Sequence, residues 1–175
     1  MGGMKAVNRI YLVGYMGAGK TTTARRLAHR LGWEVVDTDA LFEEKYKISV
    51  NDFFNKYDEP LYRKLESAVL KETETLENVV VSTGGGTACY FDNMDWMNSH
   101  GLTVFMRISP EAALDRVIHS RHKRPLVEGK SEAELAEFVN KHYASRMPFY
   151  EQARITVKSE DLDLEGLTNM IKENL

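Results

Sequence analysis

The stretch Gly14-Tyr-Met-Gly17-Ala-Gly19-Lys20-Thr21 decides the fold of this chain, because it matches the pattern G-x-x-x-x-G-K-[ST]. Glycines in such a loop let backbone N–H groups approach phosphate oxygens without a side-chain clash, and the lysine reaches the β- and γ-phosphates. The hydroxyl of Thr21 is the expected ligand of Mg²⁺. The stretch therefore predicts a phosphate-binding loop, or P-loop, with MgATP or MgGTP as its ligand.

The residues on either side of the loop fit this interpretation. Residues 9–13 are apolar and predict a strand, and residues 20–31 predict a helix that Gly32 closes as a C-terminal cap. The positive end of that helix points at the phosphates. The guanine-reading pattern Asn-Lys-x-Asp occurs at residues 55–58, early in the chain and inside an aromatic helical stretch. Since that pattern belongs after a late strand, we discount it. The residues alone do not choose between ATP and GTP.

Short β-branched runs alternate with longer amphipathic segments through the rest of the chain, which favours an α/β fold with a parallel sheet. Besides the first strand, we expect strands at residues 34–37, 79–82, 102–107 and 154–157. Residues 40–76 predict a helical region with breaks near Ser49 and Pro60. Further helices are expected from Ser109-Pro110, from the capping box that starts at Ser131 to about residue 152, and over residues 162–175.

Composition narrows the class of protein. The chain has 175 residues, which is about one domain, and a net charge of −3, without the basic excess of a nucleic-acid binder. No apolar run approaches the ~20 residues of a membrane span, and residues 1–9 lack a signal-peptide core. Cys89 is the single cysteine, expected to pack rather than react, and a reducing compartment is the simpler interpretation. We therefore expect a single cytoplasmic domain with no nucleic-acid or membrane partner.

Two acidic residues end the second predicted strand, in Asp37-Thr38-Asp39. Carboxyl ends of strands in an open parallel sheet face the ligand site, and alternation along an extended segment puts both aspartates on one side. One aspartate can organise the water shell of Mg²⁺ or take a proton, and the other can accept hydrogen bonds from substrate hydroxyls. Alternatively, Asp39 is only the N-cap of the next helix.

Other candidate ligand contacts follow later in the chain. The strand at residues 79–82 leads into Gly84-Gly85-Gly86, which predicts exposed backbone N–H groups in a small concave site, or else a loose turn. Ser82 stands where many P-loop proteins have an acidic metal partner. Arginine forks bind carboxylate and phosphate through two hydrogen bonds, and the chain offers Arg63, Arg124 and Arg146 for this role, each of which could instead be a solvated surface residue.

Together these elements resemble the shikimate kinase family over nearly the whole chain. The matching pieces, in order, are Gly14-Tyr-Met-Gly-Ala-Gly-Lys-Thr21, Asp37-Thr-Asp39, Tyr62-Arg63-x-x-Glu66, Gly84-Gly-Gly86, Arg124-Pro-Leu-Val127 and Arg146-x-x-x-Tyr150-x-x-x-Arg154. Many proteins share the P-loop, whereas its conjunction with the other pieces is far more specific.

The resemblance implies a small-molecule kinase that transfers the γ-phosphate of ATP to the 3-hydroxyl of shikimate, in the chorismate pathway to aromatic amino acids. It implies a P-loop NTPase fold of three layers, like that of nucleoside monophosphate kinases, with a five-stranded parallel sheet ordered 2-3-1-4-5. It also implies one kinase domain over residues 1–175, with substrate-binding helices at about 40–77 and a lid at about 119–130. We expect a monomer.

The resemblance assigns roles by position. The expected ATP-binding residues are Gly17, Ala18, Gly19, Lys20, Thr21, Thr22 and Arg124. Those that bind shikimate are Asp39 for the hydroxyls, Arg63 and Arg146 for the carboxylate, and Gly85 through its backbone N–H. The catalytic residues are Lys20, Asp37 and Arg124, with Mg²⁺ on Thr21 and with Asp37 in its outer shell or acting as base. Phe54 would wall the acceptor pocket, and Glu66 would orient Arg63.

Some residues depart from the family pattern. Tyr62 stands where family members often have Phe, Asp58-Glu59-Pro60 replaces a Gly-Glu pair, and the lid is short. The adenine-holding loop near residues 158–163 has no clear signature. Two alternatives stay open at this point: a gluconate kinase or other small-metabolite kinase of the same fold, and a nucleotide-gated binding module without turnover.

Overall fold

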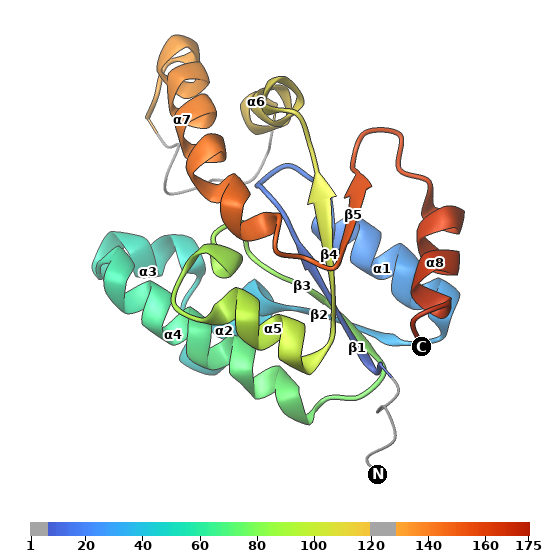
Figure 1. Ribbon diagram of the computed structural model, residues 1–175. Coiled ribbons are helices and arrows are strands. Elements are labelled where there is room, and N and C mark those ends of the chain that lie inside the picture. The colour runs from blue at the N-terminus through green and yellow to red at the C-terminus, as the bar shows by residue number, and fades with distance from the viewer. Residues whose placement is uncertain (1–6, 120–128) are drawn as a thin grey trace.

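A computed structural model describes residues 7–119 and 129–175 of the chain. Its centre is a five-stranded sheet in the order β2-β3-β1-β4-β5, with every neighbouring pair parallel (Figure 1). The strands are β1 Arg9–Val13, β2 Glu34–Asp37, β3 Val79–Ser82, β4 Leu102–Arg107 and β5 Ile155–Lys158. The predicted sheet and its order 2-3-1-4-5 are confirmed, and only the last strand begins one residue later than expected.

The register brings the ends of the central strands to one edge of the sheet. Asp37 at the end of β2 is level with Ser82 on β3, and Ser82 is level with Leu12 on β1. The P-loop follows β1 directly, and the glycine triplet 84–86 follows β3. The three segments predicted to bind ligands therefore leave the sheet side by side.

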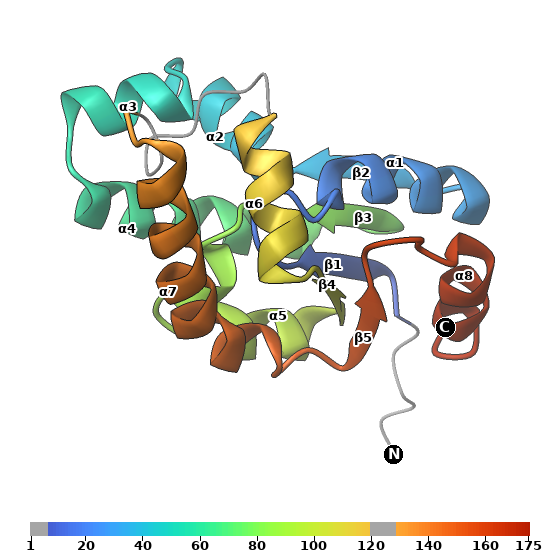
Figure 2. The ribbon, with the colours of Figure 1, turned by 90° about the horizontal axis from the view of Figure 1, so that it is seen from above.

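Helices cover both faces of the sheet and extend past its carboxyl edge. They are α1 Lys20–Leu31, α2 Thr38–Tyr46, α3 Val50–Lys56, α4 Glu59–Glu72, α5 Asn93–His100, α6 Pro110–Ile118, α7 Glu132–Tyr150 and α8 Leu164–Lys172. In Figures 1 and 2, α1 and α8 lie on one face and α4 and α5 on the other, while α6 and α7 stand beyond the strand ends. The result is the expected three-layer arrangement.

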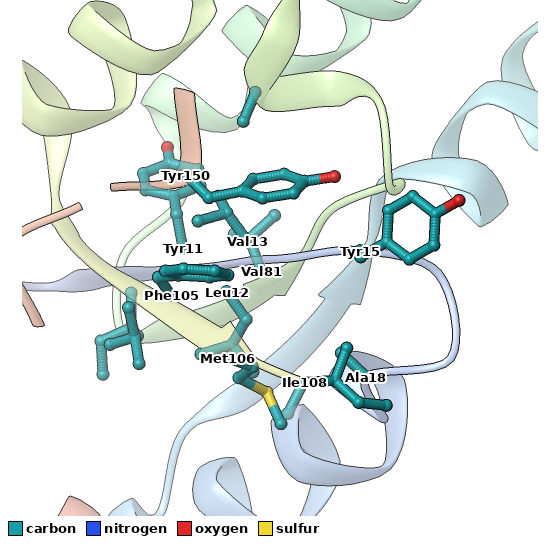
Figure 3. Packing of buried hydrophobic residues seen from close by; sticks show 14 of the residues in the cluster. Tyr11, Leu12, Val13, Tyr15, Ala18, Val81, Phe105, Met106, Ile108 and Tyr150 are labelled. Atoms are coloured by element: carbon teal, nitrogen blue, oxygen red, sulfur yellow. The ribbon is translucent and has the colours of Figure 1, made fainter. Parts of the chain in front are cut away.

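The main apolar core forms around the strands, because β1, β3 and β4 are buried on both faces and carry almost only apolar side chains. Tyr11, Phe105 and Tyr150 are fully buried there, and the rings of Phe105 and Tyr150 stack with centroids 5.2 Å apart (Figure 3). A second cluster around Phe42, Phe53 and Tyr62 holds α2, α3 and α4 together. The region predicted for acceptor binding thus has a core of its own.

Local sequence signals explain most helix ends. Gly32 closes α1 at φ 68°, the Ser109 hydroxyl accepts from the N–H of Ala112 at 3.1 Å, and Ser131 caps α7 by accepting from the N–H of Glu134 at 3.2 Å. The predicted break near Ser49 is present, where Ser49 caps α3. Among the described helices, none is long and apolar enough to cross a membrane.

The predicted break near Pro60 is also present, at Tyr57–Asp58, where the Asp58 carboxylate caps α4 and Pro60 fits into a first turn that needs no N–H donor there. Two sequence predictions need correction. The helical region begins at Thr38 and not at residue 40. Helix α5 was not predicted, and its N-cap Asp92 makes no side-chain capping bond that would have marked its start.

Candidate active site

The P-loop curls around the ammonium group of Lys20, the first residue of α1. This side chain is buried, and its Nζ donates to the backbone carbonyls of Gly14 at 2.6 Å and Tyr15 at 3.0 Å. Gly17 and Gly19 have φ values of 84° and 82°, which side-chain-bearing residues rarely adopt. The loop therefore combines a fixed cation with a helix N-terminus, which is the arrangement that binds phosphate groups.

Three oxygen-bearing side chains meet beside the start of α1. The Thr21 hydroxyl donates to Asp37 Oδ2 at 3.1 Å and lies 3.3 Å from the Ser82 hydroxyl. Oxygen ligands of this kind suit Mg²⁺, which keeps several waters and takes only one or two protein ligands beside the nucleotide phosphates. The donor set thus fits a Mg²⁺ ion bound jointly by Thr21 and a nucleotide, with Asp37 in reach of its water shell.

Asp37 and Asp39 differ in conformation, contrary to the extended geometry expected for this segment. Asp37 Oδ1 accepts from the backbone N–H groups of Asp39 at 2.9 Å and Ala40 at 3.3 Å, so Asp37 is the N-cap of α2. The alternative that Asp39 is the cap is therefore wrong. Asp39 lies in the first turn of α2, and its carboxylate turns toward the acceptor helices because it contacts Tyr62 of α4.

The Asp39 carboxylate has an unusual electrostatic environment. Crowding by protein atoms, followed by the negative charges of Asp37 and Glu66, raises the pKa of Asp39 to about 7, against the opposing charge of Lys20. The residue as a whole is nevertheless exposed to solvent. The Tyr62 hydroxyl lies 3.5 Å from Asp39 Oδ1. Asp39 is therefore placed both to accept hydrogen bonds and to change its protonation near neutral pH.

Arg63 and Glu66 form a buried ion pair one turn apart on α4. Arg63 Nη1 donates to Glu66 Oε1 at 3.1 Å, and both side chains are at most 6% exposed. Burial is the largest single influence and lowers the pKa of Arg63, but the Glu66 carboxylate together with Tyr90 and Tyr62 outweighs it and raises this pKa. The Thr87 hydroxyl donates to Glu66 at 2.9 Å, and the guanidinium lies over the Tyr90 ring at 4.3 Å. The Glu66 carboxylate therefore holds the Arg63 guanidinium in place, which is the contact that the family resemblance implied.

Arg146 on α7 is a second buried guanidinium at the same site. It is 5% exposed, and its Nη2 has no hydrogen-bond partner among the described residues. A buried N–H group of a charged side chain is costly when it lacks an acceptor, so this atom marks a place for an anionic ligand. The glycine triplet lies between the charged groups: a β-carbon on Gly84 would meet Glu66 and Asp39, one on Gly85 would meet Arg146, and one on Gly86 would meet Arg63.

The structure thus brings most predicted site residues into two adjoining groups. Lys20, Thr21 and Asp37 gather at the P-loop, and Asp39, Arg63, Gly85 and Arg146 gather at the glycine triplet. Phe54 is half-buried against the Tyr62 ring, with centroids 4.6 Å apart, and Thr22 is exposed. Arg124 and residues 120–128 of the predicted lid lie outside the described residues.

Some contacts of the site were not predicted. Arg116 of α6 donates to the P-loop carbonyl of Gly17 at 2.5 Å, and Ser159, after β5, donates to the carbonyl of Ala18. The second contact ties residues 158–163, which carry no clear sequence signature, to the P-loop. Burial raises the pKa of Cys89 to about 11, which keeps this thiol protonated and agrees with the expected packing role. No sequence motif marks Arg116 or Ser159.

Comparisons with known proteins agree on one family. A family model described as shikimate kinase matches residues 16–175. The shikimate kinase of Parabacteroides distasonis is 38% identical over 173 residues, which cover 97% of this chain and all of the relative. A crystal structure of shikimate kinase from Bacteroides thetaiotaomicron superposes with a TM-score of 0.87 at 37% identity, covering 96% of this chain and 98% of that one. A structure of shikimate kinase from Acinetobacter baumannii in complex with shikimate gives a TM-score of 0.83 at 31% identity, covering 96% and 94%.

Proposed function

The chain belongs to the shikimate kinase family, and from this premise we propose how its site transfers the γ-phosphate of ATP to the 3-hydroxyl of shikimate. Its activity is that of a shikimate kinase, in the shikimate pathway to aromatic amino acids. Family membership disfavours the two alternatives, a gluconate kinase and a binding module without turnover. The observation that carries the assignment of the site is the pair of buried arginines, Arg63 and Arg146, that flank the glycine triplet.

On the nucleotide side, we assign the phosphates of ATP to residues 17–22 and to Arg124. The buried ammonium of Lys20 is already held at the mouth of the loop by two carbonyls, so its charge is in place before the nucleotide arrives. Thr21 would hold Mg²⁺, with Asp37 in the outer shell. When bound, the ion would neutralise charge on the β- and γ-phosphates. Arg116 steadies the loop through the Gly17 carbonyl.

On the acceptor side, the substrate is a ring that carries one carboxylate and several hydroxyls. Arg63 and Arg146 would bind the carboxylate, and the unpaired Nη2 of Arg146 would gain its missing acceptor. The backbone N–H of Gly85 would add a further donor. Asp39 would accept hydrogen bonds from ring hydroxyls, and the aromatic cluster with Phe54 would form a wall. Each chemical group of the acceptor therefore has a complementary group in the site.

The transfer itself needs positioning and charge stabilisation more than covalent help. A bond forms between the 3-hydroxyl oxygen and the γ-phosphorus, while the bond from that phosphorus to the β–γ bridging oxygen breaks and ADP leaves with the electron pair. Lys20 and Arg124 would stabilise charge on the phosphoryl group. The sequence suggested Asp37 as base, but Asp37 already accepts three hydrogen bonds. We therefore place the departing proton on Asp39, whose pKa is about 7.

Three finer points remain proposals. We propose ATP over GTP and a cytoplasmic location, because both are typical of the family. We also propose a monomer, since the large apolar side chains that stay exposed in the described residues come from separate elements, with Phe91 the most exposed at 68%. Gel filtration with light scattering tests this: a mass near 20.0 kDa is expected, and twice that mass contradicts it.

Product analysis tests the proposed function. The protein is incubated with MgATP and shikimate, and the product is examined by mass spectrometry and phosphorus-coupled NMR. We expect one phosphate, on the oxygen at C3, and about 100-fold less product or lower from Lys20→Ala. Phosphate on another oxygen would overturn the proposed placement of the acceptor, and near-normal turnover by Lys20→Ala would overturn the role of the P-loop.

A further inference from the structure

Tyr15, the second residue of the P-loop, joins the nucleotide loop to α7 through its side chain. Its backbone carbonyl accepts from Lys20 Nζ at 3.0 Å, while its side chain is fully buried. The Tyr15 hydroxyl lies 3.0 Å from His142 Nδ1 on α7. The Tyr15 ring also packs edge-on against His142 and Tyr143, with centroids 5.5 and 5.4 Å apart. Figure 3 shows Tyr15 beyond the end of β1, apart from the rings of the central core.

The same part of α7 carries the arginine assigned to the acceptor carboxylate. His142 precedes Arg146 by four residues, so the two side chains lie on one face of the helix. The guanidinium carbon of Arg146 is 6.0 Å from the centre of the Tyr15 ring. A β-carbon on Gly85 would lie 3.2 Å from the backbone nitrogen of Met16 and 3.4 Å from Arg146 Nη1. The P-loop and Arg146 therefore approach Gly85 from two sides, and Tyr15 touches both His142 and Arg146.

The charge state of His142 suits this contact. The charged groups that act on it are Arg146, Arg63 and Glu59, from α7 and α4. Burial, followed by the two arginines, lowers the pKa of His142 to about 4. The imidazole is therefore neutral near pH 7, so it can share one hydrogen with the Tyr15 hydroxyl without placing a third positive charge beside the arginines.

Other buried contacts hold α7 elsewhere. The Tyr143 hydroxyl donates to the carbonyl of Ile108, which fixes α7 to the connection between β4 and α6. At the end of α7, the Tyr150 hydroxyl donates to the carbonyl of Gly85. The bond between Tyr15 and His142 is a side-chain hydrogen bond that joins α7 to the P-loop itself.

We infer that Tyr15 and His142 are positioning residues, whose hydrogen bond fixes Arg146 relative to the P-loop and so sets where the acceptor carboxylate lies relative to the γ-phosphate. The inference rests on the proposed role of Arg146 in binding that carboxylate. Neither Tyr15 nor His142 is inferred to contact the substrate through this bond. Loss of the bond should therefore affect the acceptor and leave nucleotide binding nearly unchanged.

Tyr15→Phe tests the inference, because it removes only the hydroxyl and keeps the ring against Arg146. We expect KM for shikimate to rise about 3- to 10-fold, the range for one neutral hydrogen bond, with KM for ATP within about 2-fold of wild type. His142→Leu removes the partner on α7 and should give the same result, a raised KM for shikimate with KM for ATP nearly unchanged. It also provides a second test if Tyr15→Phe folds poorly. The double variant should be no worse than either single variant, because both remove one bond.

Tyr143→Phe is the matched control. It also removes the hydroxyl of a buried tyrosine of this aromatic cluster, but that hydroxyl donates to the carbonyl of Ile108 and not to His142. It should lower the melting temperature without a selective rise in KM for shikimate. An unchanged KM for shikimate in Tyr15→Phe, an equal rise in KM for ATP, or additive effects in the double variant would each overturn the inference. Absence of shikimate phosphorylation by the wild-type protein would instead overturn the proposed function.

Discussion

Gly86 lies so close to Arg63 that a β-carbon at position 86 would stand 2.5 Å from Nη1 and 2.7 Å from Cζ of the guanidinium. Real β-carbons do not approach other heavy atoms this closely, and the backbone of Gly86 is otherwise ordinary, with φ −94°. The glycine is therefore needed for the space that Arg63 fills and not for backbone freedom. The third glycine of the triplet and the first arginine of the acceptor site form one unit.

Gly86→Ala should displace Arg63 and weaken acceptor binding. Because Arg63 is also tied to Glu66 and Glu59, the added methyl group has to disturb a buried ion pair. We expect KM for shikimate to rise about 10-fold or more, the scale of one lost charge-assisted hydrogen bond. The dissociation constant of ATP, measured by calorimetry on the same variant, is the internal control. Normal KM for shikimate would show that Arg63 does not bind the acceptor in the position seen here.

Glu66→Gln should destabilise the protein as well as its acceptor site. The change removes the buried charged partner of the Arg63 guanidinium and leaves it only the more exposed Glu59 carboxylate, so we expect a loss of about 1–3 kcal/mol in the free energy of unfolding. Glu137→Gln is the matched control, because its ion pair with Lys141 has the same charges but side chains 69% and 78% exposed. That control should leave the free energy of unfolding nearly unchanged, because solvent screens an exposed pair. Equal effects in urea unfolding would contradict the role given to Glu66.

The pH dependence of acceptor use should follow Asp39. Its folded-state pKa of about 7 means that the carboxylate loses its charge, and with it the capacity to accept a proton, as pH falls through 7. We expect kcat/KM for shikimate to fall below about pH 7 with a slope of one proton. In Asp39→Asn the residual kcat/KM should lack this limb. A wild-type profile that stays flat from pH 6 to 8 would exclude Asp39 as the titrating group.

The ionisation of Asp39 should lower the stability of the protein, although the same ionisation favours activity. Because the folded-state pKa is raised above the ordinary value, ionisation of Asp39 opposes folding, and this penalty is full above pH 7. The penalty declines as pH falls from 7 toward the unfolded pKa of about 4. Asp39→Asn should therefore raise the melting temperature at pH 8 and have little effect at pH 4. A lower melting temperature at pH 8 would contradict the environment described for this carboxylate.

Arg146→Ala should separate the acceptor site from the nucleotide site. Removal of the guanidinium should raise KM for shikimate and lower kcat, for a combined loss of about 10- to 100-fold or more in kcat/KM, while ATP still binds. Arg146→Lys should recover little, because an ammonium group cannot replace two parallel N–H donors. Arg30→Ala, an exposed arginine on α1, is the control and should be neutral. If KM for shikimate does not change in Arg146→Ala, Arg146 is not part of the acceptor site.

Sequence reasoning succeeded where a signal is local. The P-loop, the caps at Gly32, Ser109 and Ser131, and four of the five strands depend on residues a few positions apart, and the structure has them as predicted. Asp39 was misplaced because Asp37 and Asp39 are both possible caps, and which of them caps depends on where β2 ends. Propensity alone does not decide that point.

The contacts that the sequence missed are distant ones. Arg116 meets Gly17 across 99 positions, and Tyr15 meets His142 across 127. Neither pair has a spacing that a helix or a strand would reveal, because the packing of α6 and α7 beyond the sheet edge brings them together. A resemblance to a family supplies Arg63 and Arg146, whereas these distant contacts emerge only from the three-dimensional structure.

A coupled assay of ADP release from MgATP, run with shikimate, with gluconate and without acceptor, tests the central claim most directly. We predict rapid release with shikimate alone, reduced about 100-fold or more in Lys20→Ala, the scale for loss of one preorganised charge. Release with gluconate, or equal release with no acceptor, would keep the P-loop fold and contradict the acceptor that Asp39, Arg63 and Arg146 are proposed to bind.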